Sequence, residues 1–309
     1  MARVLELCEN VLAQLESADW AAAAVAVALH IANVAVRAFA WRNIVVAAYP
    51  ARRVGKRKLF VAYAAGAGFN SMCPWRGGEV LRLSLARRSV TGSTYAGLAS
   101  TMAAETVFNA VAAGALIGWA LARGAVPIPE LGTSTAVAVG IAALTLGAVV
   151  LRCRRRFWSS FGTGFRVFSD PVAYLRDVAV WQALDWILRL ATIYWFMVAF
   201  RIDGGFEALL LIQGAQSASA LLPLTPARIG TKQAVLAYAL GSHVPAESLV
   251  AFVVGSELLL AGTNAALGIG AMLAELGTLR CRSSARTSSR AVRSSFGSRT
   301  STGSWWRAR

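Results

Sequence analysis

The stretch CPWRGGEVLRLSLARR (residues 73–88) interrupts a chain that is otherwise rich in Ala, Val and Leu. It follows an apolar run of fifteen residues, 59–73. At about 1.5 Å per residue such a helix reaches about 22 Å, which is short of a hydrocarbon core of about 30 Å. Pro74, Gly77 and Gly78 are residues that end or turn helices. The sequence therefore predicts a re-entrant hairpin over 59–90, which turns inside the membrane and returns to the side it entered from.

The composition is that of an integral membrane protein. The chain has 309 residues, of which 57% are hydrophobic and 15% charged, and a soluble domain cannot bury so much apolar surface. The net charge is +16, but the basic residues lie in loops and in the tail, as expected for a protein oriented by the positive-inside rule. Because no soluble basic domain is present, the charge does not indicate nucleic-acid binding.

The apolar pattern divides the chain into helical segments. Residues 1–19 read as an amphipathic interfacial helix, and the tail 277–309 as disordered, because it is rich in Arg, Ser, Thr and Gly. A second short apolar run, 208–222, ends in PLTPARIGTK, where Pro223, Pro226 and Gly230 predict another turn. The predicted full spans are 20–49, 93–122, 134–151, 174–200 and 248–276.

Charge in the loops sets the predicted topology. The basic segments 51–58, 152–156 and 280–309 belong in the cytoplasm, whereas the nearly neutral loops 123–133, 201–207 and 242–247 belong outside. Given these sides, the number of membrane crossings requires 59–90 to enter from the inside and return there. By the same count, 208–241 must enter from the outside and return there. The two hairpins therefore enter the membrane from opposite sides, and such non-helical turns are tolerated at that depth only where protein or water covers them.

The two turns share the pattern P-x-R-x-G, from Pro74 to Gly78 and from Pro226 to Gly230, at an offset of 152 residues. At the same offset Asn33 corresponds to Asp185, Arg37 to Arg189 and Glu105 to Glu257. The prediction is an all-α polytopic protein with an inverted repeat of span, re-entrant hairpin and span, halves at 20–124 and 172–276, and a connecting span between them. Transporters of this plan bind substrate near the midplane. Coincidence within a chain of low complexity is the alternative.

Charges at membrane depth are costly and must face the protein interior or water. We expect Arg76 and Arg228, at the two hairpin tips, to clamp a lipid phosphate, because the planar guanidinium group binds phosphate in a bidentate manner. Arg37 and Arg189 are second candidates for this contact. Glu105 and Glu257 would hold Arg76 and Arg228 in place. Asp185 lies four residues before Arg189 and can pair with it. Further candidates for the same cavity are Glu79 and Lys232. The alternative is a purely structural set of salt bridges. For Arg82, Arg87 and Arg88, headgroup contact or a role in topology is expected.

No specific enzyme signature is present. The chain lacks the sequence patterns of a nucleophile elbow, a zinc protease, a nucleotide-binding loop and a dinucleotide-binding turn. The four cysteines are isolated and only two histidines occur, so the sequence indicates neither a metal site nor a cofactor.

Four segments carry a resemblance to a known family: LHIANVAVRAFAWRNIV, FNSMCPWRGGEVLRLSLARR, the Glu of STMAAETVF, and LPLTPARIGTKQAVL. They resemble the flippase-like transmembrane domain of lysylphosphatidylglycerol synthases and its stand-alone bacterial relatives, over roughly 20–276. The resemblance implies a multi-pass bacterial plasma-membrane protein that moves lipids between leaflets. Members usually carry an Asp four residues after this Glu, where Asn109 stands here. Because this sequence contains no match to the aminoacyl-transferase domain of the synthases, we do not expect it to synthesise the aminoacyl lipid.

The function expected from residues and resemblance together is a translocase, not an enzyme, for phospholipids or glycolipids with an anionic headgroup. One alternative is a non-transporting subunit that presents lipid to a partner glycosyltransferase or lipid-modifying enzyme. A second is an intramembrane transferase with an unrecognised site. Membrane lipids are the expected partners, and the tail is expected to dock on anionic cytoplasmic headgroups.

Overall fold

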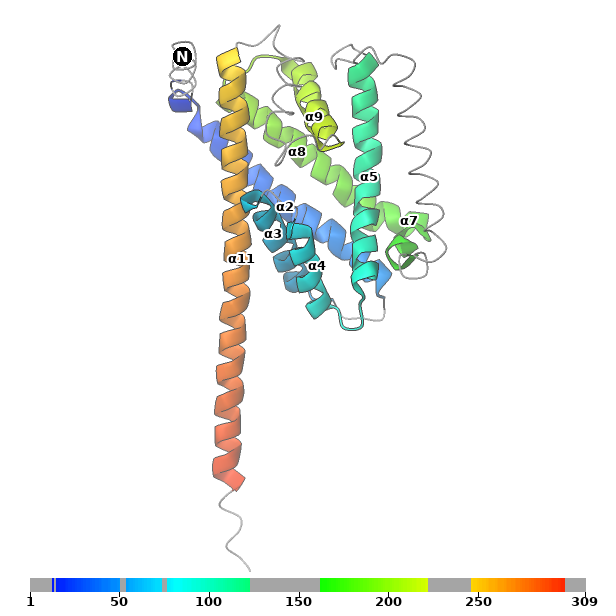
Figure 1. Cartoon of the computed structure of the whole chain (residues 1–309), viewed down its shortest axis with the longest axis vertical. Coiled ribbons are helices and arrows are strands. Elements are labelled where there is room, and N and C mark those ends of the chain that lie inside the picture. The colour runs from blue at the N-terminus through cyan, green and yellow to red at the C-terminus, as the bar shows by residue number, and fades with distance from the viewer. Residues whose placement is uncertain are drawn as a thin grey trace, which may run out of the picture.

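The computed structural model describes residues 13, 15–50, 54–73, 77–122, 162–221 and 246–297. Within these ranges the chain is mostly helical and contains no strand (Figure 1). The expected all-α class is confirmed. Residues 1–12, residues 74–76 of the first hairpin turn, most of the connecting segment with the predicted span 134–151, and the second hairpin turn lie outside the described ranges.

The helices follow the apolar segments of the sequence closely. Two of them contain stretches, Trp20–Ala48 and Ser248–Glu275, that are long and apolar enough to cross a membrane, which agrees with a membrane protein. The elements are α2 (Trp20–Ala48), α3 (Lys56–Met72), α4 (Gly77–Ser89), α5 (Tyr95–Ala122), the 3₁₀ turn η1 (Arg166–Phe168), α7 (Pro171–Tyr174), the π-helical turn η2 (Leu175–Ala179), α8 (Val180–Ala199), α9 (Gly205–Leu221) and α11 (Ala246–Gly297).

Helices α2 and α8 pack along each other in antiparallel fashion and form the centre of the bundle (Figure 1). The side chain of Asp19 caps α2 by accepting hydrogen bonds from the backbone nitrogens of Ala21 and Ala22 at 2.9 and 3.1 Å. The backbone nitrogen of Asp19 donates to the carbonyl of Ala199, at the opposite end of α8. Small residues early in α2 pack against large ones late in α8; this apolar cluster includes Ala22, Ala23, Ala26, Phe196 and Met197.

Helices α3 and α4 form a tight hairpin whose halves meet at glycines. The backbone nitrogen of Gly78 donates to Oδ1 of Asn70 at 2.9 Å, and Gly78 lies against the carbonyl of Gly66. Gly77 and Gly78, which the sequence placed in the turn, are the first residues of α4. Their role is close helix packing, because a side chain at position 78 would separate the two helices.

The α3–α4 hairpin and α9 pack against different long helices. Helix α3 packs along α11, where Gly68 lies against Gly268 and the carbonyl of Asn264. Helix α9 packs against α5. In Figure 1, α2 and α8 run together along a diagonal, α11 and α5 stand upright over them, and the α3–α4 hairpin and α9 lie between these two long helices.

The structure differs from expectation at the C-terminus. Helix α11 continues through Gly297, whereas the sequence suggested disorder from residue 277 (Figure 1). The physical reason is that extending an existing helix avoids the nucleation cost, and no Pro occurs between Ala246 and Gly297. Residues 298–309 lie outside the described ranges.

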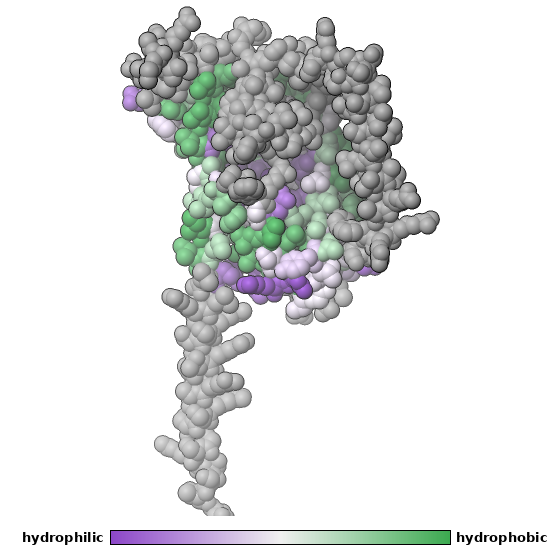
Figure 2. All heavy atoms as spheres, viewed as in Figure 1, coloured by the Kyte–Doolittle hydropathy of each residue, from purple (hydrophilic) through white to green (hydrophobic). Residues whose placement is uncertain are grey.

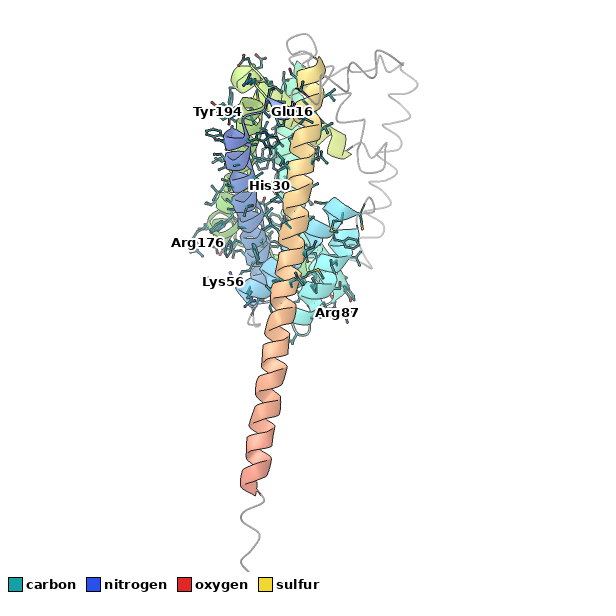
Figure 3. All side chains as sticks on the ribbon, turned by 90° about the vertical axis from the view of Figure 1, so that its left-hand side faces the viewer. Glu16, His30, Lys56, Arg87, Arg176 and Tyr194 are labelled. Carbon is teal, nitrogen blue, oxygen red and sulfur yellow. The ribbon has the colours of Figure 1, made fainter. Side chains whose placement is uncertain are left out.

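The two ends of the bundle differ in charge. Figure 3 shows Glu16 near one end, Lys56 and Arg87 toward the other, and His30 between them. Hydrophilic side chains gather at the end of the bundle from which α11 extends (Figure 2). Lys56, Arg57, Lys58, Arg87 and Arg88 are all exposed. These positions agree with a helical bundle whose basic end faces one membrane surface and whose middle is apolar outside.

The contact between α3 and α4 leads to a stability prediction. In a Gly78→Ala variant the new Cβ would overlap the carbonyl oxygen of Gly66 and the side chain of Asn70. Because this neighbour is backbone, we expect a loss of about 1–3 kcal/mol in the free energy of unfolding. The measurement is thermal unfolding of detergent-purified protein by Trp fluorescence.

Gly262→Ala is the matched control, since a Cβ at position 262 meets nothing within 4 Å. It removes a helix-interior glycine and should leave the melting temperature unchanged or raise it. Equal effects of the two substitutions would contradict the close packing of the hairpin.

Candidate functional site

A buried carboxylate lies where α2 and α8 cross. Asp185 of α8 has a fully buried side chain. Nδ2 of Asn33 donates to Oδ1 of Asp185 at 2.5 Å and to its carbonyl oxygen at 2.9 Å. Nη2 of Arg189 donates to Oδ2 at 2.9 Å, so the predicted pairing of Asp185 with Arg189 is present. Asn33 and Arg189 thus satisfy both carboxylate oxygens.

Arg37 approaches the same carboxylate without bonding to it. Its Nε lies 4.0 Å from Oδ1 of Asp185, beyond hydrogen-bond distance. Nε is buried and has no hydrogen-bond partner among the described residues, although 37% of the side chain is exposed. Its Cζ lies 5.7 Å from the centroid of the Tyr63 ring. Among the described residues, Nε of Arg37 is therefore an unused donor on a partly exposed side chain.

A second ion pair joins α4 to α5. Nη2 of Arg82 donates to Oε2 of Glu105 at 2.6 Å, and both side chains are buried. The guanidinium carbon lies 3.8 Å from the centroid of the Trp41 ring and 4.2 Å from that of Tyr63. Nε1 of Trp41 in turn donates to the hydroxyl of Thr101 at 3.1 Å. Aromatic faces and a carboxylate therefore enclose Arg82.

Tyr63 connects the two ion pairs, because its ring lies near both Arg37 and Arg82. We call the joined group the central cluster; its charged members are Arg37, Arg82, Arg189, Glu105 and Asp185. It holds three cations against two anions, an excess of one positive charge among the described residues. The cluster is therefore suited to accept an anion.

Neutral polar residues link the central helices to the two long ones. Nε2 of His30 in α2 lies 3.0 Å from Oδ1 of Asn264 in α11. Asn109 in α5 connects to α8, since its Oδ1 accepts from Nε1 of Trp186 at 3.0 Å and its Nδ2 donates to Gln182 at 3.4 Å. Asn109 thus belongs to an uncharged network between α5 and α8.

The structure brings together only part of the site inferred from the sequence. Arg37, Glu105, Asp185 and Arg189 meet in or beside the central cluster. Glu79 is exposed on α4, and Glu257 is exposed on α11, where it does have an interaction partner. The residues that lie outside the described ranges are Arg76, Arg228, Lys232, Pro74, Pro223, Pro226 and Gly230.

Arg82 does not lie where the sequence predicts it. Its position in LRLSLARR predicts a place near the cytoplasmic surface, but Arg82 is buried and paired with Glu105. The signal that could have found it is spacing: Arg82 follows Gly78 by four residues and so shares its face of α4. A Cβ at Gly66 would contact both Gly78 and Arg82, so this face packs on α3.

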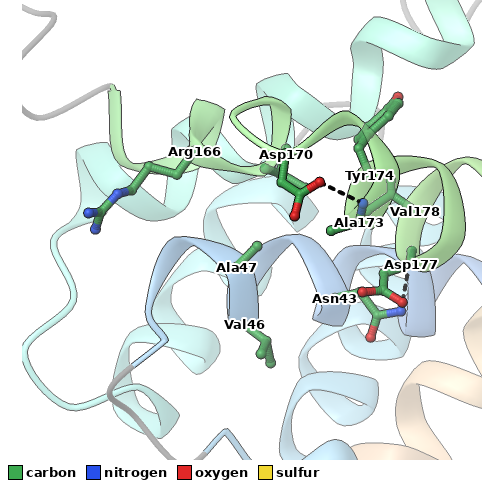
Figure 4. Close-up of a pocket in the computed structure, with 10 residues that line it drawn as sticks. Asn43, Val46, Ala47, Arg166, Asp170, Ala173, Tyr174, Asp177 and Val178 are labelled. Carbon is green, nitrogen blue, oxygen red and sulfur yellow. Dashed lines mark hydrogen bonds between the residues drawn. The ribbon is translucent and has the colours of Figure 1, made fainter.

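A separate cavity of about 350 Å³ lies between the end of α2 and the segment from η1 to η2 (Figure 4). Its polar lining is engaged locally: Asp170 caps α7, and Asn43 donates to the carbonyl of Asp177 at 2.7 Å. None of the central-cluster residues lines it. In the described part of the chain no group of His, Cys, Asp and Glu is arranged to hold a metal ion.

Comparison with known proteins gives one family. Residues 6–268 match the family described as the lysylphosphatidylglycerol synthase TM region, which confirms the resemblance noted in the sequence. No curated protein matches the chain.

The buried pair of Arg82 and Glu105 leads to a stability prediction. Glu105→Gln keeps the side-chain shape but leaves the guanidinium group buried without its counter-charge. We expect the free energy of unfolding to fall by about 3 kcal/mol. The measurement is the melting temperature of purified protein in detergent.

Glu79→Gln is the control, because Glu79 is exposed, and it should change stability by less than about 0.5 kcal/mol. Adding Arg82→Met to Glu105→Gln should recover part of the loss, since no unpaired charge then remains. If Glu105→Gln were as harmless as Glu79→Gln, the ion pair would not hold α4 to α5.

Proposed function

Because the chain belongs to the lysylphosphatidylglycerol synthase transmembrane-region family, we propose that it binds membrane lipids by an anionic headgroup and moves them between leaflets. The observation that carries the proposal is the excess positive charge of the central cluster, with Arg37 unbonded. The proposal places the chain in the bacterial plasma membrane as a multi-pass protein with its basic end in the cytoplasm. It assigns no chemical step to the chain.

Energetics favours a ligand at Arg37. An arginine at the centre of a membrane helix costs about 2.5–3.5 kcal/mol on insertion scales. Arg82 and Arg189 offset this cost by bonding to Glu105 and Asp185, but Arg37 has no such bond in the described structure. A phosphate group supplies both the missing charge and the acceptors for a bidentate guanidinium contact.

The helix bounds support the inverted repeat. Adding 152 to the bounds of α2 gives 172–200, where α7, η2 and α8 together run from Pro171 to Ala199. The same shift takes α3 to 208–224, beside α9 at Gly205–Leu221, and takes α5 to 247–274, within α11. Each half would then contain a central helix, a short helix and a long helix in the same order.

Contacts between the halves also support a two-fold relation. Helix α3 packs on α11, and its counterpart α9 packs on α5. Each short helix thus packs on the long helix of the other half. His30 bonds to α11, while Gln182, its counterpart at the same offset, bonds to α5. Asn33 and its counterpart Asp185 bond directly to each other, as two residues close to such an axis can.

In this arrangement α3 and α4 form one re-entrant hairpin, and the segment that begins with α9 forms the other. Arg76 and Arg228, at their tips, would supply further donors to the phosphate near the midplane. Movement would be downhill or coupled to an ion. The lipid-presenting subunit remains the competing function, and the following experiment separates the two.

The test is lipid transfer in reconstituted vesicles. Purified protein is placed in phosphatidylethanolamine–phosphatidylglycerol vesicles with a trace of NBD-labelled phosphatidylglycerol, and dithionite quenching reports exchange between leaflets. Arg37→Gln should slow transfer at least about tenfold, because one charged hydrogen-bonding contact contributes about 1.5–3 kcal/mol. Its melting temperature should stay close to that of the wild type, since Nε of Arg37 has no hydrogen-bond partner among the described residues and lies 4.0 Å from the carboxylate of Asp185.

Lys56→Gln is the control, an exposed cation at the basic end, and should leave transfer unchanged. A protein that binds the labelled lipid but never transfers it would be a presenting subunit. Equal transfer by wild-type and Arg37→Gln protein would remove Arg37 from the proposed site.

A further inference from the structure

One carboxylate stands between two equivalent arginines. At the offset of 152 residues Arg37 corresponds to Arg189, and both lie next to Asp185. Arg189 is bonded to it at 2.9 Å, whereas Arg37 lies 4.0 Å away. The two members of an equivalent pair are therefore in different states in the same structure.

The difference arises from the residue pair on the axis. Asn33 and Asp185 correspond to each other, but only Asp185 carries charge, so one carboxylate serves two guanidinium groups. In this structure Arg189 holds Oδ2 and Asn33 holds Oδ1 of that carboxylate, and Arg37 is left 4.0 Å from it.

We propose that Asp185 alternates between Arg189 and Arg37, and that each arginine, when released, forms an anion half-site for a phosphate-bearing lipid headgroup. This inference rests on the proposed function. In the described state Arg37 is open. In the alternative state Asp185 bonds to Arg37 and Arg189 is open. The headgroup competes with Asp185 for each arginine in turn, and so passes from one half to the other.

The exchange requires only a small movement of the Arg37 side chain. Nε of Arg37 has to approach Oδ1 of Asp185 by little more than 1 Å to reach hydrogen-bond distance. Both arginine side chains are partly exposed, at 37% and 28%, whereas the carboxylate is fully buried. The acid is thus held at the axis by Asn33, and the arginines are the groups that have room to move.

A carboxylate swap tests the inference. In the Asn33→Asp plus Asp185→Asn variant the carboxylate moves to the equivalent position, where it lies four residues before Arg37. The two states exchange roles, so we expect transfer of NBD-phosphatidylglycerol within about threefold of the wild type. Asp185→Asn alone leaves both arginines without a carboxylate, whereas Asn33→Asp alone adds a second acid four residues before Arg37, in contact with Asp185.

A measurement of lipid binding distinguishes the expected effects of the single variants from a general loss of structure. Anisotropy of NBD-phosphatidylglycerol titrated with detergent-purified protein should show Asp185→Asn binding at least about threefold tighter, while its transfer falls about tenfold because release is no longer driven. Asn33→Asp should bind about tenfold more weakly, which corresponds to about 1.4 kcal/mol.

A purely structural Asp185 gives different results. Asp185→Asn would then weaken both binding and transfer, and the swap would not restore transfer; either result overturns the alternation. If the wild type binds the lipid but does not transfer it, translocation is refuted. The opposite shifts in binding by the two single variants then still support two half-sites, and their absence overturns them.

Discussion

The structure depends on keeping one buried carboxylate paired. Asp185 is fully enclosed at the crossing of α2 and α8, where an unpaired charge would be prohibitive. Two hydrogen bonds from Asn33 and one from Arg189 satisfy it, and this requirement fixes the register of the two central helices. The surrounding elements are placed by that register, because α3, α5, α9 and α11 all lie against the crossed pair or against one another.

Local sequence patterns predicted the helices and several members of the cluster. Arg37, Glu105, Asp185 and Arg189 stood out because charges are rare inside apolar runs, and the four-residue spacing predicted the bond between Asp185 and Arg189. The hydrogen bond from Asn33 could not be derived with the same certainty, since it joins residues 152 positions apart. The shared offset indicated that the two positions correspond, but only tertiary packing shows that they touch.

Arg82 shows where local reasoning fails. LRLSLARR resembles a basic helix end at a membrane surface, and Arg87 and Arg88 are indeed exposed. Arg82 is buried because glycines at positions 66 and 78 allow α4 to approach α3, which brings the guanidinium group onto the rings of Trp41 and Tyr63. Glu105 is bonded to Arg82, while the hairpin-tip arginines that the sequence predicts as its partners, Arg76 and Arg228, lie outside the described residues. Helix contacts set by small residues thus decide that Arg82 meets Glu105.

The three arginines of the central cluster differ in how accessible their guanidinium groups remain to a ligand. Arg82 has aromatic rings within 4.2 Å of its guanidinium carbon and a 2.6 Å bond to Glu105, so it joins helices and has little capacity for a ligand. Arg189 is bonded to a carboxylate but remains partly exposed. Arg37 has no hydrogen bond among the described residues and is the most exposed of the three. The side chains thus become more open as the nearest aromatic ring and carboxylate lie farther from the guanidinium group. This order separates the arginine that is enclosed between helices from the two that we propose as anion half-sites.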